Sequence, residues 1–323
     1  MTRDEVLQLK VIVVAGGWSS EHDISMQSGE ACQAALTAAG FKGVDLVDVA
    51  EPDFIQRLLA GNYDVVFVAM HGSYGEDGCI QGLLETLHIP YTFSGVLGSA
   101  LACEKTVAKI LYADAGIPTP KGVTLAATDE VTNERLDQIV DELGLPLFVK
   151  PVSNGSSFGV TSVAEETQLK KAIADAAALD SEILIEERIM GTEITVPVIG
   201  NDDPQALPIV EIVTGADYYD LKVKYEPASM HHVVPARLEA GVYARAQKLA
   251  IKAHKALHCL GASRSDFIVK DDGTPVILET NTIPGMTERS LLPDSARHGG
   301  IEFPELCTRF IEFALEAHGK GER

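Results

Sequence analysis

The sequence predicts a protein of mixed α/β and α+β class, made of three segments that meet at a central cleft. In the first hundred residues, two continuous apolar runs at 11–15 and 65–70 each end at a glycine-containing turn and precede a helical pattern. This order is typical of a parallel α/β unit. From about residue 104, short strand patterns separated by turns take over, which indicates α+β segments. A length of 323 residues is enough for two or three domains of ordinary size.

The first segment should place two loops at one edge of its sheet. The strand at 11–15 stops at Gly16-Gly17, and a polar loop leads to an alanine-rich amphipathic helix from about 28 to 38. The strand at 65–70 ends at His71-Gly72 and enters a glycine-rich loop at 72–78, after which a helix begins near residue 80. Functional loops of a parallel sheet lie at the carboxyl ends of its strands. We therefore expect both loops to face the same cleft.

A rigid linker separates the first segment from the remainder of the chain. Pro118 and Pro120 fix φ at two nearby positions and disfavour helix. After the linker we expect strands at 147–150, 159–163 and 183–186, with a helix at 166–178. The third segment should contain strands at 193–199, 207–213, 267–269 and 276–279, and helices at 241–257 and 303–318. The sequence has no internal repeat and no low-complexity tract.

Composition excludes several classes of protein. A hydrophobic content of 46% and a charged content of 23% are ordinary for a globular chain and exclude disorder and collagen-like repeats. A net charge of −21 argues against binding to a nucleic-acid backbone, although local lysines can still gather a small anion. The five cysteines include no CxxC pair, so neither a zinc ribbon nor a disulfide framework is indicated. No apolar run approaches the roughly 18 residues of a membrane span, and residues 1–10 are too polar for a signal peptide, so we expect no membrane partner and a cytoplasmic location.

Common phosphate-binding motifs are missing, but one other candidate is present. There is no GxxxxGK[ST] match and no GxGxxG match. Instead, a strand delivers Lys150, and the Gly/Ser-rich turn PVSNGSSFG follows at once. A lysine supplies a point charge to phosphate oxygens, and backbone N–H groups and hydroxyls in such a turn can surround them. The alternative interpretation is a hairpin turn with an exposed lysine.

A second candidate site contains two acids and an amide. Asp266 and Glu279 lie on adjacent strand patterns, and Asn281 is two residues beyond Glu279 on the same face. Carboxylate and amide oxygens are hard ligands that suit Mg²⁺, and buried acids are costly unless they hold a cation. The alternative is a pair of acids on an edge strand that face solvent.

Other polar residues are weaker candidates when each is taken alone. Each has a simple structural interpretation, as a solvated loop residue, a hydrogen-bonded histidine at a strand end, a turn glycine or a helix cap. They are Glu21, His22, His71, Tyr219, Lys224, Tyr225, Gly285 and Ser290.

Taken together, these motifs resemble the D-alanine–D-alanine ligases of the ATP-grasp superfamily. The resemblance covers residues 11–314 in the order of the family's motifs. These are GGWSSEHDISMQSG, HGSYGEDGCIQGLLE, SGVLGSALACEK, AGIPTP, VKPVSNGSSFGV, ILIEERIMGTEITV and LETNTIPGMTERSLLP. Several long motifs in the correct order are far more specific than one glycine pattern.

The resemblance implies a three-domain ATP-grasp fold with an N-terminal Rossmann-like parallel-sheet domain. The implied domains are 1–103, which binds the first D-alanine, 104–190, and 191–323, the last two of which hold ATP between them. The implied nucleotide-binding residues are Lys105, Lys150, Ser156, Ser157, Glu186, Glu187, Arg188, Ile189, Glu193, Tyr219 and Lys224. Residues 186–189 would bind adenine through backbone groups, and Glu193 would contact the ribose. Asp266, Glu279 and Asn281 would hold two Mg²⁺ ions, with Mn²⁺ as a substitute.

The resemblance also implies a reaction. ATP would phosphorylate the first D-alanine, and the amine of the second would attack the acyl phosphate to give D-alanyl-D-alanine for peptidoglycan precursors. The implied catalytic residues are Glu21, Ser156, Tyr225, Arg264 and Gly285. The implied substrate-binding residues are Glu21, His71, Lys224, Tyr225, Arg264, Gly285, Ser290 and Leu291. Glu21 would hold the ammonium of the first D-alanine, and Ser290 and Leu291 the carboxylate of the second.

One residue, Tyr225, indicates the identity of the second substrate. In the family, tyrosine at the position of Tyr225 accompanies dipeptide formation, and phenylalanine accompanies D-lactate as acceptor. Residues 218–235 would form a loop that closes over the site. Met230-His231-His232, Ile283 and Asn154 depart from the usual pattern. They leave open a ligase with D-serine, D-lactate or another acceptor in a specialised pathway. A separate alternative is a non-catalytic nucleotide-binding protein, and the site residues argue against it because all are present, namely Lys150, Arg264, Asp266, Glu279 and Asn281. The family commonly forms homodimers.

Overall fold

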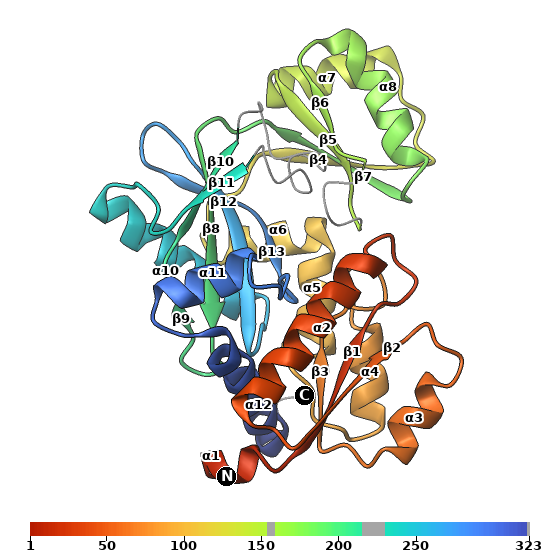
Figure 1. Cartoon of the computed structure of the whole chain (residues 1–323). Helices are drawn as coiled ribbons and strands as arrows, with labels where there is room; N and C mark the ends of the chain where they lie inside the picture. The colour runs from red at the N-terminus through yellow and green to blue at the C-terminus, as the bar shows by residue number, and fades with distance from the viewer. Residues whose placement is uncertain (154–158, 215–229, 322–323) are drawn as a thin grey trace.

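Three sheets with flanking helices make up the computed structural model, which describes residues 1–153, 159–214 and 230–321 (Figure 1). The first sheet has the order β2-β1-β3 and is parallel throughout. Its strands are β1 (Lys10–Ala15), β2 (Gly43–Asp48) and β3 (Val65–Val68). Strands β1 and β3 are buried along almost their whole length, as expected for continuous apolar runs in a sheet covered on both faces. The predicted parallel-sheet unit is confirmed.

Helix α2 (His22–Ala39) begins about six residues earlier than the predicted helix. Its first turns are polar, but Ser25 and Ser28 are fully buried. The Ser25 hydroxyl accepts from the Gly16 N–H at 2.8 Å and donates to the Ala69 carbonyl at 2.8 Å. Because these polar groups bind the strand ends, the helix starts without the apolar periodicity on which the prediction depended. The other helices of this region are α1 (Arg3–Val6), α3 (Phe54–Ala60), α4 (Cys79–Thr86) and α5 (Val96–Cys103).

The central sheet is antiparallel and has the order β4-β7-β5-β6. Its strands are β4 (Gly122–Ala126), β5 (Leu147–Pro151), β6 (Thr161–Val163) and β7 (Glu182–Glu187). Helices α7 (Asn133–Leu143) and α8 (Glu166–Ala177) pack on it, with Leu147, Val149 and Ile185 in the shared apolar cluster. Helix α6 (Lys105–Asp114) and the proline-containing linker lead into this sheet.

The third sheet has the order β11-β10-β8-β12-β13, with β9 added beside β8. Its strands are β8 (Thr192–Ile199), β9 (Gln205–Ala206), β10 (Val210–Thr214), β11 (Met230–Val233), β12 (Ala262–Val269) and β13 (Pro275–Asn281). Helix α10 (Ala240–Ala256) packs on it, and α11 (Leu291–His298) and α12 (Phe303–Lys320) follow. The expectation of a loop across 218–235 is wrong at its end, since 230–233 pairs antiparallel with β10. The β-branched Val233, opposite Glu211, suits that ladder.

Two helices pack on sheets distant from them in the sequence. Phe310 of α12 lies in one apolar cluster with Phe67 and Phe93, and α12 runs beside α2 (Figure 1). Ala108 and Tyr112 of α6 belong to the cluster under the third sheet. The division into domains 1–103, 104–190 and 191–323 stays a prediction. Among the described residues, no helix has both the length and the apolar character needed to cross a membrane.

Candidate functional site

The two loops at the carboxyl ends of β1 and β3 lie against each other, as predicted. A Cβ placed on Gly72 would be 2.9 Å from Oε2 of Glu21, and the φ of Gly72 is +73°. Only a residue without a side chain fits there at low cost. The Ser19 hydroxyl donates to the His71 carbonyl at 2.8 Å. The Glu21 carboxylate is thereby placed next to the glycine-rich loop.

His71 connects these loops with the last sequence motif. Its Nε2 is 2.9 Å from the Ser28 hydroxyl, which also accepts from the Met286 N–H at 3.4 Å. His71 and Ser28 are buried. Nδ1 of His71 is 3.7 Å from a carboxylate oxygen of Glu76, and burial raises the pKa of Glu76. Elements separated by more than 250 residues in the chain therefore meet at one hydroxyl group.

The turn after Pro284 presents backbone groups next to a helix start. A Cβ on Gly285 would lie 3.0 Å from the Ser290 hydroxyl. Ser290 is the N-cap residue of α11, but its hydroxyl makes no capping bond. It accepts instead from the Thr287 N–H at 3.1 Å. Leu291 is the first residue of α11 and is buried. The N–H groups and the dipole at this helix start favour a negatively charged ligand group.

Three charged side chains gather where α6 meets the central sheet. Lys150 of β5 forms an ion pair with Glu186 of β7, and Lys109 of α6 forms another with the same carboxylate. The lysine side chains are 14% exposed and that of Glu186 is 3% exposed. The alternative interpretation of Lys150 as an exposed hairpin lysine is therefore wrong. Lys105, at the start of α6, donates from its ammonium group to the Val152 carbonyl at 3.3 Å.

The pKa of Glu186 reflects two opposing effects. Burial raises it, and the charges of Lys150 and Lys109 outweigh the burial, so the pKa lies below its ordinary value. Glu186 is therefore ionised at neutral pH, and the cluster has one positive charge in excess. Burial lowers the pKa of Lys109 in spite of its partner.

The segment predicted to bind adenine follows directly at the end of β7. The Glu187 carboxylate accepts from the Lys121 N–H at 2.8 Å, and the Arg188 guanidinium donates to the Ser162 hydroxyl at 3.3 Å. Both side chains are thus bound to neighbouring elements. Ile189 follows them, and Glu193 lies two residues into β8, opposite Ile268.

The two predicted acids lie face to face on neighbouring strands. Asp266 of β12 is paired with Glu279 of β13, and Arg264 is paired with Asn281. Directly opposite residues of antiparallel strands project to the same side, so these four side chains share one face. The Arg264 guanidinium donates to both oxygens of Asp266 at 3.1 and 3.0 Å. The Asn281 side-chain oxygen accepts from the Ile283 N–H at 2.8 Å, which fixes its orientation.

This donor set has the chemistry of a Mg²⁺ site. Within the described part of the chain, no cluster of three or more His, Cys, Asp or Glu side chains is arranged to hold a metal ion. The predicted set requires only two such residues, with the Asn281 amide oxygen as its third donor. The Asp266 side chain is 16% exposed, so the alternative of solvent-facing acids does not describe it.

Some predicted residues lie outside the described residues. They are Ser156, Ser157, Tyr219, Lys224 and Tyr225. Other residues were not found from the sequence, namely Ser28, Glu76, Lys109 and Met286. Lys109 had one usable signal, because it follows Lys105 by four residues and so shares its helix face.

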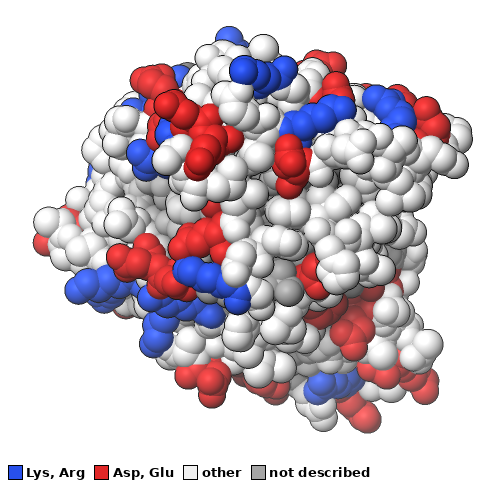
Figure 2. All heavy atoms as spheres, turned by 90° about the horizontal axis from the view of Figure 1, so that it is seen from below, with Lys and Arg blue, Asp and Glu red and all other residues white. Residues whose placement is uncertain are grey.

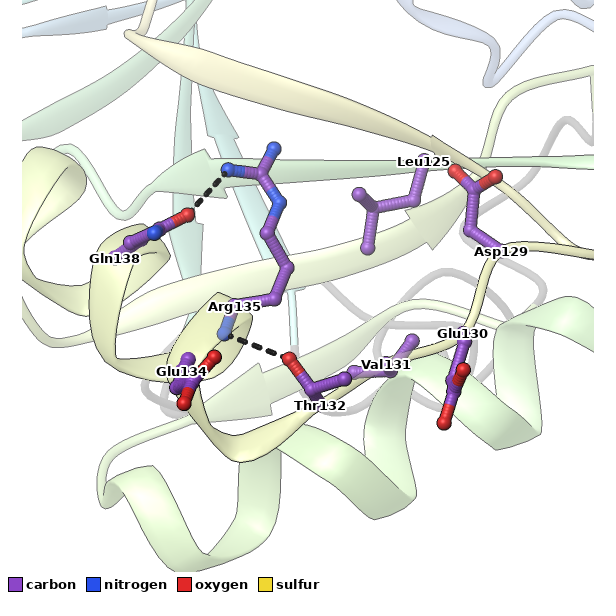
Figure 3. A pocket seen from close by; sticks show the side chains of 8 residues that line it. All are labelled: Leu125, Asp129, Glu130, Val131, Thr132, Glu134, Arg135 and Gln138. Atoms are coloured by element: carbon purple, nitrogen blue, oxygen red, sulfur yellow. Dashed lines mark hydrogen bonds between the residues drawn. The ribbon is translucent and has the colours of Figure 1, made fainter.

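A pocket of about 400 Å³ on the central segment contains none of the predicted site residues (Figure 3). The Arg135 guanidinium on its wall donates to the neighbouring Gln138 side chain, and Thr132 caps α7. On the face shown in Figure 2, basic side chains lie beside acidic ones and form no continuous basic surface.

Comparison with known proteins identifies relatives over nearly the whole chain. A family model described as D-ala D-ala ligase C-terminus matches residues 111–312, and one described as D-ala D-ala ligase N-terminus matches 48–94. The chain is 43% identical over 314 residues to a D-alanine–D-alanine ligase of Desulforamulus reducens, covering 96% of this chain and 100% of the relative.

Solved structures agree with these matches. The D-alanine–D-alanine ligase of Bacillus anthracis complexed with ATP superposes with a TM-score of 0.84 at 34% identity, covering 97% of this chain and 99% of that one. The VanG D-Ala:D-Ser ligase of Enterococcus faecalis superposes with a TM-score of 0.80 at 30% identity, covering 95% of this chain and 99% of the other.

Proposed function

The chain belongs to the D-alanine–D-alanine ligase family, and from that membership we propose that it joins two D-alanine molecules in an ATP-dependent reaction. The products are D-alanyl-D-alanine, ADP and phosphate, and the dipeptide supplies peptidoglycan precursor synthesis. The observation that best supports this function is the contact between Ser28 and the Met286 N–H, because it brings the first and last motifs together at the predicted substrate site.

The nucleotide binds between the second and third segments. Lys105, Lys150, Ser156 and Ser157 bind its phosphates. Backbone groups of 186–189 hold adenine, and Glu193 holds the ribose. Tyr219 and Lys224 complete the site. In the proposed division into domains, residues 1–103 bind the first D-alanine, and the domains 104–190 and 191–323 bind ATP between them.

Asp266, Glu279 and Asn281 would hold two Mg²⁺ ions, with Mn²⁺ as a substitute. When bound, these ions would offset negative charge on the phosphate groups. Arg264, which contacts Asp266, and the backbone at Gly285 stabilise the oxyanion that forms at the reacting carboxyl group.

The energetic problem of the reaction is the poor reactivity of a carboxylate. Transfer of the terminal phosphoryl group of ATP to the carboxylate of the first D-alanine converts one of its oxygens into part of a leaving group. The amine of the second D-alanine then attacks the carbonyl carbon, and phosphate departs. Glu21 holds the first ammonium group beside Gly72 and His71. Positioning and electrostatic stabilisation dominate such transfers.

The acceptor carboxylate binds at the start of α11, at Ser290 and Leu291, where the helix dipole favours an anion. Tyr225, with Ser156 and Glu21, favours an amine as the attacking group. The enzyme acts in the cytoplasm, where ATP is supplied, as a homodimer.

The test is identification of the product. The purified protein is incubated with ATP, Mg²⁺ and D-alanine, and the mixture is analysed by mass spectrometry and phosphate release. Parallel reactions offer D-alanine together with D-serine or D-lactate. We expect D-alanyl-D-alanine as the main product. Preferential formation of the mixed product with D-serine would assign the chain to the D-Ala:D-Ser ligase activity for which the VanG relative is named, and no product with any acceptor would refute a ligase.

A further inference from the structure

The cluster of Lys109, Glu186 and Lys150 contains one residue to which the proposed function gives no role. Lys109 lies on α6, which packs under the third sheet, whereas Glu186 and Lys150 lie on the central sheet. Its ammonium group reaches across to the Glu186 carboxylate. In Figure 1, α6 lies below β4 and β7 of the central sheet.

The two lysines bind different oxygens of one carboxylate. Lys109 contacts Oε1 and Lys150 contacts Oε2 of Glu186. Lys109 also donates to the Pro120 carbonyl at 2.6 Å and to the Thr119 hydroxyl at 3.3 Å. An ammonium group has three N–H donors, so these three acceptors satisfy Lys109 completely and fix its position.

Lys150 is held differently. Glu186 is its ion-pair partner among the described residues, and that bond takes only one of its three donors. A phosphate that binds the remaining donors of Lys150 draws its ammonium group away from Glu186 and weakens their contact. A carboxylate that is 3% exposed and loses its partner would carry an uncompensated buried charge, which is strongly unfavourable. Lys109 removes that difficulty, because it stays on Oε1 when Lys150 turns away.

We propose that Lys109 is a positioning residue that neutralises Glu186 and so frees Lys150 to bind the nucleotide phosphates. This proposal rests on the proposed function for the identity of the nucleotide. With Lys109 present, the cluster offers a net positive charge to the phosphates. Without it, Glu186 and Lys150 form a neutral pair, and the phosphates must compete with Glu186 for Lys150, the one lysine left in this cluster.

The experiment measures nucleotide binding without any amino acid. Isothermal titration calorimetry compares a non-hydrolysable ATP analogue (the β,γ-imido compound, with Mg²⁺) and adenosine, which has no phosphate. Lys109→Met should weaken binding of the analogue by about ten- to a hundredfold, the range for loss of a charge-assisted contact. Adenosine binding should change by less than about threefold. A general structural defect would weaken both ligands equally, and that result would overturn the proposal.

Three further variants sharpen the test. Lys109→Arg keeps the charge and should bind the analogue within about threefold of wild type. The double variant Lys109→Met/Glu186→Gln removes the competing carboxylate and should recover about tenfold over the single variant. Lys171→Met breaks an exposed lysine–carboxylate pair with Asp175 on α8 and should have no effect.

Each outcome of these measurements either supports or contradicts the proposed role of Lys109. Wild-type affinity for the analogue in Lys109→Met, or no recovery in the double variant, contradicts the proposal. If Lys109→Met does not fold by circular dichroism, the arginine and double variants provide the decision, since the first keeps a cation beside Glu186 and the second removes the carboxylate charge that Lys109 neutralises. In steady state, Lys109→Met should raise KM for ATP and leave KM for D-alanine unchanged. A wild-type protein that makes no dipeptide would refute the proposed function, while the binding series would still test Lys109.

Discussion

His254 provides a stability prediction whose size follows from the structure. It lies on α10, is 1% exposed, and its Nδ1 is 2.8 Å from the Ser263 hydroxyl on β12. The same strand carries Arg264 and Asp266. Burial lowers the pKa of His254 to about 4, from an ordinary value of 6.5. The folded protein therefore keeps this imidazole neutral at pH values where the unfolded chain protonates it.

The sign of the effect follows from proton binding. Between pH 6.5 and pH 4 the unfolded chain binds the extra proton, so acidification through this window favours unfolding. The contribution of His254 to stability is thus present above pH 6.5 and is lost as the pH falls toward 4. From the two pKa values, lowering the pH from 7 to 5 costs about 2 kcal/mol through this residue alone.

The assay is urea denaturation of wild type and His254→Gln at pH 7 and pH 5. Glutamine does not titrate, so the loss of stability between the two pH values should be smaller in the variant by about 2 kcal/mol. His258→Asn is a matched control, because it removes an exposed histidine at a position with φ of +53°, a conformation that asparagine tolerates. It should keep the wild-type pH dependence. An equal loss in wild type and His254→Gln would refute the argument.

Three other predictions concern the site. Replacing Glu279 and Asn281 together by alanine should abolish ADP formation in a protein that still folds by circular dichroism, and turnover at the wild-type rate would contradict the assigned metal ligands. Tyr225→Phe should raise the ratio of depsipeptide to dipeptide product when D-lactate competes with D-alanine, and mass spectrometry would reveal an unchanged ratio if the assignment is wrong. His22 lies 2.8 Å from Asp48, and this hydrogen bond raises its pKa above 6.5. An NMR titration should find that Asp48→Asn brings this pKa down, and identical titration curves would count against the contact.

The sequence alone predicts the elements that are marked by a local pattern, such as strands buried on both faces. The strands at 11–15 and 65–70 are continuous apolar runs, and their short length, their β-branched residues and the glycines that follow favour a strand covered on both faces. The glycines after them marked the loops, and the pairing of Asp266 with Glu279 followed from two adjacent strand patterns. In each case a local pattern determines the local structure.

Other elements depend on partners distant in the chain. The start of α2 is polar in sequence because Ser25 and Ser28 bind strand ends and the Met286 turn. The strands at 43–48 and 122–126 are only partly buried, so their apolar pattern is weak. Strand β11 exists through its pairing with β10, although it lies at the end of a segment that reads as a loop. The pattern of neighbouring residues contains no information about such distant partners, so it does not predict these elements.

The same distinction explains why Lys109 was not found while Lys150 was. Lys150 stands before a Gly/Ser-rich turn, which is a recognisable local pattern. Lys109 acts through Glu186, which is 77 residues away in the chain, and through the linker carbonyl of Pro120. Motif reading finds groups that touch a ligand, because those groups occur in the loops that surround it. A residue that sets the charge balance behind such a group is recognised only when the buried carboxylate and both of its lysines are seen together.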